Sequence, residues 1–134
     1  THTANAVLIG SGTSAITSVS PGTSGNVLVS NGSTWSSAAP SGQPDPTLTG
    51  VNLSVSEGQF VVATAGSITL TLPSSPSAGD FVIIKDGTGA AETTSFTVAR
   101  NGSNIASSAS DLTFDKNFAE ITMVYISGSV GWSV

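Results

Sequence analysis

Apolar and polar residues alternate along the chain after residue 47. In SITLTLP, residues 67–73, Ile68, Leu70 and Leu72 fall on one side, and VNLSV at 51–55 has the same period. A period of two predicts strands with one buried face. Further apolar segments lie at 60–63, 81–85, 95–100, 111–114, 119–126 and 130–134, separated by turn-forming residues. No window of helical period interrupts them, so residues 47–134 are expected to form an all-β sandwich or jelly roll of about eight short strands.

Residues 1–46 have a different character. They contain one acidic residue, no Lys or Arg and one aromatic residue, and they end in PSGQPDP, which is typical of an extended linker. VLIGSGTS at 7–14 and VLVSNGST at 27–34 match in residue type, which suggests an internal repeat. Each copy is typical of a short apolar strand, a Gly-containing turn and a polar strand.

The second copy carries a strong hairpin signal at Asn31-Gly32. A two-residue turn there would place Leu28 opposite Trp35, with Val27 and Val29 on the other face. An isolated hairpin cannot bury both faces. We therefore expect other copies of the chain to cover the candidate interface residues, which are Val27, Leu28, Val29 and Trp35. A flexible Ser/Gly linker is the alternative interpretation.

Charge and composition exclude several classes of partner. Only 8% of residues are charged, and the net charge is -5, with no basic patch that could hold nucleic acid. No apolar run approaches the roughly 18 to 20 residues needed for membrane insertion. Cysteine is absent, which excludes disulfides, thiolate metal sites and a Cys nucleophile. The start, THTANA, without Met or a leader, is expected to belong to a longer polypeptide.

The sequence offers little catalytic chemistry. His2 is the only histidine and has no acid or nucleophile beside it, and no G-x-S-x-G motif precedes a helix. Asp111 and Asp115 bracket LTF; on a strand their Cα atoms would be about 13 Å apart, too far for a glycosidase pair. DGTG at 86–89 lacks the alternating oxygen ligands of a calcium loop and is interpreted as a tight turn. We expect no catalytic residue, no metal site and no cofactor.

Two segments carry a resemblance to a known family. GTSGNVLVSNGSTWSSAAP at 22–40 resembles a repeat in the shafts of tail fibres of tailed bacteriophages. SITLTLPSSPSAGDFVIIKD at 67–86 and the C-terminal residues 100–134 are similar to small β-domains of such fibres. The similarity covers most of the chain and omits mainly 41–61. In that family pattern the residue after the final Trp is often basic, whereas here it is Ser133.

The resemblance implies a homotrimer with an intertwined β shaft over 1–46 and a small antiparallel β-sandwich, jelly-roll-like, over 47–134. It implies an extracellular virion tail protein that contacts other tail proteins and binds a polysaccharide or protein receptor on the host surface. The receptor-binding residues stay unassigned among the loops at 74–80, 86–94, 101–110 and 127–131. A structural connector of the fibre or baseplate, and a bacterial extracellular carbohydrate-binding or adhesin module, are the alternative functions.

Overall fold

The computed structural model describes residues 6–10, 15–39 and 42–134, and these residues contain β-strands and no helix. The predicted all-β class is therefore confirmed. The chain divides into two compact units, an N-terminal unit (Thr1–Gly42) and a C-terminal unit (Gln43–Val134). The two units have separate sheets, and the hydrophobic core cluster belongs to the C-terminal unit.

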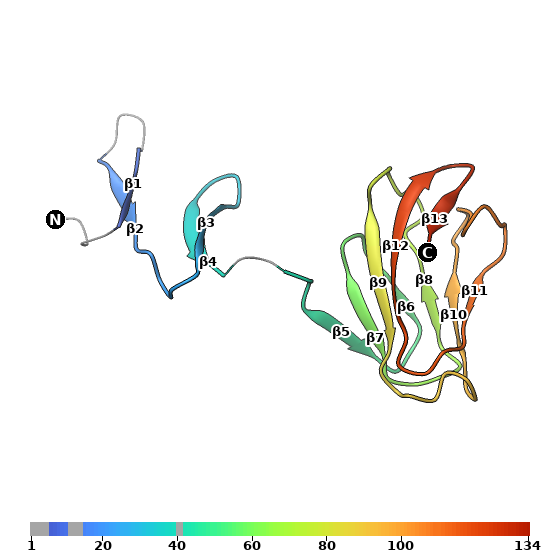
Figure 1. Cartoon of the computed structure of the whole chain (residues 1–134). Helices are drawn as coiled ribbons and strands as arrows, with labels where there is room; N and C mark the ends of the chain where they lie inside the picture. The colour runs from blue at the N-terminus through green and yellow to red at the C-terminus, as the bar shows by residue number, and fades with distance from the viewer. Residues whose placement is uncertain (1–5, 11–14, 40–41) are drawn as a thin grey trace. The chain divides into compact units, whose positions relative to one another are not determined.

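The N-terminal unit contains two antiparallel hairpins (Figure 1). The first pairs β1 (Val7–Ile9) with β2 (Thr17–Val19), and the second pairs β3 (Val27–Ser30) with β4 (Trp35–Ala38). In the second hairpin Leu28 lies opposite Ser37, and Trp35 lies opposite Ser30. The predicted pairing of Leu28 with Trp35 is therefore wrong, although both residues still lie on the same face of the hairpin because the pairing is displaced by two residues.

The side chain of Asn31 explains the displaced pairing. Its Oδ1 accepts hydrogen bonds from the backbone N–H of Ser33 and Thr34, at 2.9 and 2.7 Å, and from the Thr34 hydroxyl at 3.1 Å. These bonds close a loop of four residues, in which Gly32 supplies a φ of +88°. Asx turns of this kind compete with the tight two-residue turn that Asn-Gly otherwise favours.

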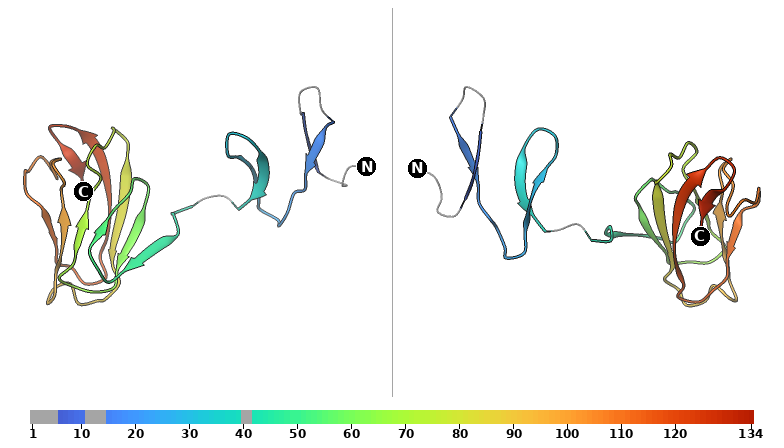
Figure 2. Two further views of the ribbon diagram at one scale, coloured as in Figure 1. Left: turned by 180° about the vertical axis from the view of Figure 1, so that it is seen from behind. Right: turned by 45° about the horizontal axis from the view of Figure 1, so that its top comes forward.

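The C-terminal unit contains nine strands in two sheets. The larger sheet has the order β13-β12-β9-β7-β5, and the smaller has the order β11-β10-β8-β6. The two sheets face each other in the views of Figure 1 and Figure 2. The strands are β5 (Pro46–Thr49), β6 (Leu53–Ser54), β7 (Phe60–Ala63), β8 (Thr69–Thr71), β9 (Phe81–Asp86), β10 (Phe96–Ala99), β11 (Leu112–Phe114), β12 (Glu120–Ser127) and β13 (Gly131–Ser133).

The predicted antiparallel, jelly-roll-like topology is wrong for this unit. Four of its seven strand pairs are parallel: β5 with β7, β7 with β9, β6 with β8, and β8 with β10. The reason is that consecutive strands from β5 to β10 alternate between the two sheets, so neighbours in one sheet are two strands apart in the chain and run the same way. Only the pairs made by β11, β12 and β13 are antiparallel, and they complete one edge of each sheet.

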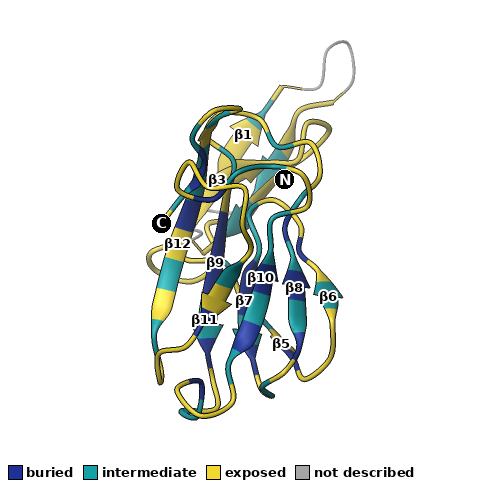
Figure 3. Cartoon of the chain, turned by 90° about the vertical axis from the view of Figure 1, so that its right-hand side faces the viewer, coloured by how far each residue is buried: buried dark blue, intermediate teal, exposed yellow. Residues whose placement is uncertain are grey.

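The hydrophobic core lies between the two sheets. Ile68, Leu70 and Leu72 are buried, as predicted from their alternation with Ser and Thr. Figure 3 shows buried segments on β8, β9, β10 and β12. The rings of Phe96 and Phe114, which are register partners, stack with centroids 4.6 Å apart. The other members of the core cluster are Val55, Val61, Ala63, Val82, Ile84, Ala91, Val98, Ile105, Met123 and Trp132.

One predicted strand is shorter than expected. Of VNLSV at 51–55, only Leu53 and Ser54 form a strand, and Val51 is exposed instead of facing inward. The hydroxyl of Thr49 donates to the Val51 carbonyl at 2.9 Å and lies 3.3 Å from the Val51 N–H. This turn carries the chain from β5 in one sheet to β6 in the other, which removes Val51 from the alternating pattern.

Candidate functional site

The predicted interface residues lie exposed on the second hairpin. Val27, Leu28, Val29 and Trp35 keep 40 to 47% of their accessible surface in the single chain. Leu28 and Trp35 lie on one face and Val27 and Val29 on the other, so the single hairpin leaves apolar side chains open on both faces. Val7 and Leu8 of β1 are similarly exposed. An apolar surface of this extent is unusual for a chain that functions alone.

A short polar network joins the second hairpin to the segment that follows the first. The Asn26 amide donates to the Ser37 hydroxyl at 3.0 Å, and this hydroxyl donates in turn to the Pro21 carbonyl. A cavity of about 140 Å³ lies beside this network, lined partly by Val7, Val19, Val27 and Leu28. The network fastens the connecting segment to β4 through polar groups and leaves Val7, Val27 and Leu28 exposed.

The carboxylates considered for catalysis do not meet in the structure. Asp111 and Asp115 lie immediately before and after β11, and Asp111 accepts a hydrogen bond from the Arg100 backbone N–H at 2.9 Å. Within the described ranges, no group of three or more His, Asp or Glu side chains could hold a metal ion. His2 falls outside the described residues.

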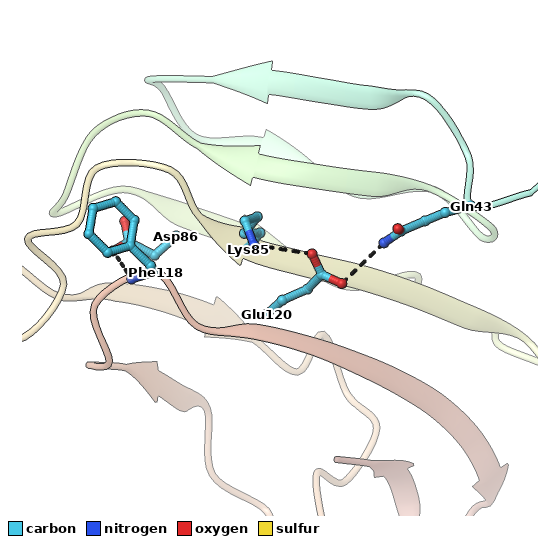
Figure 4. Close-up of polar contacts among 5 residues, drawn as sticks. All are labelled: Gln43, Lys85, Asp86, Phe118 and Glu120. Atoms are coloured by element: carbon cyan, nitrogen blue, oxygen red, sulfur yellow. Dashed lines mark hydrogen bonds and ion pairs between the residues drawn. The ribbon is translucent and has the colours of Figure 1, made fainter.

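The DGTG segment forms a tight turn around a buried carboxylate. Asp86 ends β9 and is fully buried. Its Oδ1 accepts from the Thr88 hydroxyl at 2.7 Å and the Thr88 N–H at 2.8 Å, while its Oδ2 accepts from the N–H groups of Gly89 and Phe118, both at 3.0 Å. Figure 4 shows the bond to Phe118, which ties the turn after β9 to the segment before β12.

Burial and hydrogen bonding act on Asp86 in opposite directions. Burial raises the pKa of the carboxyl, but the hydrogen bonds from the Thr88 hydroxyl and from the backbone of Phe118, Thr88 and Gly89 outweigh it. The pKa is lowered from 3.8 to about 2. Asp86 therefore remains charged at neutral pH and serves as an anchor for two loops rather than as a proton donor.

Phe118 rests on this turn with one face of its ring. A Cβ built on Gly89 would clash with Cζ of Phe118 and would lie 2.6 Å from both Cε1 and Cε2. Because the two Cε atoms are equally close and Cζ is closer, the Cβ position lies to one side of the ring plane, at its Cζ end. The Phe118 side chain is 66% exposed, so the opposite face is open to solvent.

Two polar side chains join the loop that carries Gly89 to the residue before Phe118. The Glu92 N–H donates to Oδ1 of Asn117 at 2.9 Å, and the Asn117 amide lies 3.4 Å from Oε2 of Glu92. Both residues are exposed. The loop at 87–95, which overlaps the predicted recognition loop 86–94, is thus joined side by side to the segment at 115–119. We name Phe118, Glu92 and Asn117 the aromatic platform.

The sequence does not predict Phe118 as a site residue, because DKNFAE at 115–120 shows no alternation that distinguishes an exposed aromatic residue from a core one. The available signal was weak. Asn117 precedes an aromatic residue in a turn between two strands, where apolar residues are uncommon. Only its backbone geometry and the exposure of its ring distinguish Phe118 from the buried Phe96 and Phe114.

Two further features lie near the platform. A groove of about 180 Å³ between β11 and β12 is lined by Leu112, Thr113, Phe114, Asp115, Lys116, Ala119, Ile121 and Val134. On β9 and β12, Lys85 and Glu120 form an ion pair at 3.3 Å, and the Gln43 amide donates to the other oxygen of Glu120 at 3.2 Å (Figure 4). Gln43 thereby fastens the segment that leads into β5 to the larger sheet.

Comparisons with known proteins add no family. No model of a protein family matches the chain, and no curated protein matches it either. In the described part of the chain there is no helix long and apolar enough to cross a membrane. The aromatic platform and the exposed N-terminal hairpins are therefore interpreted from their own geometry.

Proposed function

We propose that this chain is part of a homotrimeric tail fibre of a tailed bacteriophage and attaches the virion to the surface of its host. The observation that carries the proposal is the second hairpin, which exposes Val27, Leu28, Val29 and Trp35 on two faces. The resemblance of residues 22–40, 67–86 and 100–134 to fibre segments supports the same assignment.

The exposed hairpin supports assembly from several copies. A two-stranded hairpin is marginally stable at best in water, because it cannot bury both faces. Complete burial of an exposed Val or Leu side chain stabilises by about 1.5 to 3 kcal/mol, and covering the surface that the three aliphatic residues and Trp35 still expose therefore favours association. Neighbouring chains that wrap their hairpins together would cover both faces and form an intertwined β shaft over the N-terminal unit.

The C-terminal unit provides the surface for attachment in this proposal. Its two sheets form a rigid support, and loops on a rigid support commonly carry recognition. Three copies would present three equivalent sites, and linked weak sites bind a surface with greater avidity than one site alone. The receptor would be a polysaccharide or a protein on the host surface.

The assembly is tested by the mass of the full chain in solution. Light scattering should give a trimer at micromolar concentration, and the double substitution Val29→Ser with Trp35→Ser should reduce the mass toward the monomer. Val51→Ser, which removes an exposed apolar side chain from the C-terminal unit, is the matched control and should leave the trimer intact. A wild-type monomer would refute the shaft.

Attachment needs a separate test. Fluorescently labelled chain should stain host cells, and extracted surface polysaccharide should compete with the staining if the receptor is a glycan. A trimer that stains no host cell would remove the attachment function and would assign the chain to a structural connector of the fibre.

A further inference from the structure

Phe118 has a backbone conformation that does not suit its side chain. Its φ is +55°, in the left-handed region that glycine enters freely and bulky residues avoid. The other non-glycine residues with positive φ in the described part of the chain are small or polar: Ser67, Asn101, Ala106 and Ser107. Glycine or asparagine at 118 would relieve the strain, so the phenyl ring is not explained by the backbone.

Core packing does not explain the ring either. Phe118 is 66% exposed and lies outside the hydrophobic core cluster. The Cζ end of its ring lies against Gly89, a glycine with a φ of +68° and no room for a side chain. A strained and exposed aromatic residue is a feature that occurs at binding sites, where the side chain contacts a ligand.

The backbone that carries the ring is nevertheless held firmly. The Phe118 N–H donates to the buried Asp86 carboxylate, which also binds the Thr88 and Gly89 N–H groups of the adjacent turn. Figure 4 shows the bond from Phe118 to this anchor. A backbone fixed before binding loses little conformational freedom when a ligand stacks on its side chain.

The groups around the ring indicate the chemistry of the ligand. Asn117 precedes Phe118 in the chain, and Glu92, on the loop that carries Gly89, bonds to Asn117; Oε1 of Glu92 has no hydrogen-bond partner among the described residues. A pyranose presents an apolar C–H face together with hydroxyls at its edge, which matches a ring flanked by hydrogen-bonding groups. The Glu92 carboxylate and the net charge of -5 would repel an acidic sugar.

We propose that the aromatic platform binds a neutral saccharide, with the pyranose stacked on the free face of Phe118 and its hydroxyls bonded to Glu92 and Asn117. The inference rests on the proposed attachment function, for which it names the ligand class and the residues of the site. Phe118 is the stacking residue, and Asp86 and Gly89 position it.

The test uses the full chain on a panel of immobilised neutral hexose oligosaccharides and uronic-acid oligosaccharides. The wild type should bind members of the neutral set and not the acidic set. Phe118→Asn should weaken that binding about tenfold or more, because a full stacking contact is lost, while Phe118→Tyr should retain it. Ile126→Ser, which removes another exposed apolar side chain of the C-terminal unit, is the matched control.

Thermal unfolding and light scattering of each variant separate binding from folding and assembly. Phe118→Asn should unfold at the same temperature as the wild type or higher, since Asn tolerates a positive φ. The inference is overturned if the wild type binds no neutral oligosaccharide, if it binds the acidic set equally well, if Phe118→Asn binds like the wild type, or if this variant loses the trimer.

The same variants distinguish the two proposals. If labelled wild type and Phe118→Asn stain host cells equally, attachment stands and the platform is not its site. If the wild type stains no host cell but binds neutral oligosaccharides through Phe118, the attachment function fails and the sugar site stands.

Discussion

Replacing Asp86 by Asn tests whether the buried carboxylate holds the two loops together by its charge. In the wild type, Oδ1 accepts two hydrogen bonds from Thr88, and Oδ2 accepts from the N–H groups of Gly89 and Phe118. An amide has nearly the same shape but only one acceptor oxygen. In Asp86→Asn an NH₂ group would therefore face either the N–H and hydroxyl of Thr88 or the N–H groups of Gly89 and Phe118 at a buried position, which is costly.

The magnitude follows from the pKa. The carboxyl of Asp86 has a pKa of about 2 in the folded protein, against 3.8 as its ordinary value. Since one pKa unit equals 1.36 kcal/mol, the ionised carboxylate contributes about 2 kcal/mol to the free energy of unfolding at neutral pH. Because the folded pKa is the lower one, this contribution is complete above pH 4 to 5 and is lost as the pH falls toward 2.

The assay is guanidinium unfolding of the full chain between pH 2 and pH 7, followed by tryptophan fluorescence with Trp35 replaced by Phe in every variant, so that the signal comes from the buried Trp132. We expect Asp86→Asn to be less stable than the wild type by at least about 2 kcal/mol at pH 7, and the difference to shrink below pH 4. Asp80→Asn is the matched control, because Asp80 Oδ2 accepts a single hydrogen bond, from Ser77. If the difference in the free energy of unfolding between Asp86→Asn and the wild type stays constant from pH 7 to pH 2, the electrostatic explanation is refuted.

Three further substitutions test the packing of the C-terminal unit by the same unfolding assay at pH 7. Gly131→Ala should destabilise by more than about 2 kcal/mol, because Gly131 has a φ of +75° and a Cβ would strike the Asn104 carbonyl; a smaller loss would show that the turn relaxes. Leu70→Ala should cost about 2 to 5 kcal/mol, since Leu70 is fully buried between the sheets, and a cost below 1 kcal/mol would contradict that placement. Lys85→Met should change the free energy of unfolding by less than about 1 kcal/mol, because its ion pair with Glu120 is partly exposed, and a loss that exceeds this value would show a stronger pair than the geometry indicates.

The alternation of apolar and polar residues predicted well which side chains are buried. It predicted poorly how one strand connects to the next. Ile68, Leu70 and Leu72 are buried as their period requires. Val51, with the same period, is exposed, because the Thr49 hydroxyl bonds to the backbone of Val51 and turns the chain toward the other sheet. A binary pattern records which faces are apolar, and it does not record a turn that changes sheets.

The turn at Asn31-Gly32 shows the same limit at a smaller scale. The dipeptide correctly located a hairpin, and the distribution of apolar residues over both faces follows from the period of two. The register depends on three hydrogen bonds to the Asn31 side chain, which enlarge the loop to four residues. Several turn types are compatible with Asn-Gly, so the dipeptide alone did not choose among them.

By itself, the sequence determined the all-β class, the contrast between the first 46 residues and the remainder, and the apolar faces of the strands. These properties depend on local periodicity and composition, which any arrangement of the strands must satisfy. The tertiary structure alone decided that β5 to β10 alternate between two sheets and pair in parallel, and that Phe118 lies open above Gly89 on an anchor formed by Asp86. These properties depend on contacts between residues far apart in the chain. Short polar turns of similar composition are compatible with several arrangements of the strands, so the sequence pattern does not choose among these arrangements.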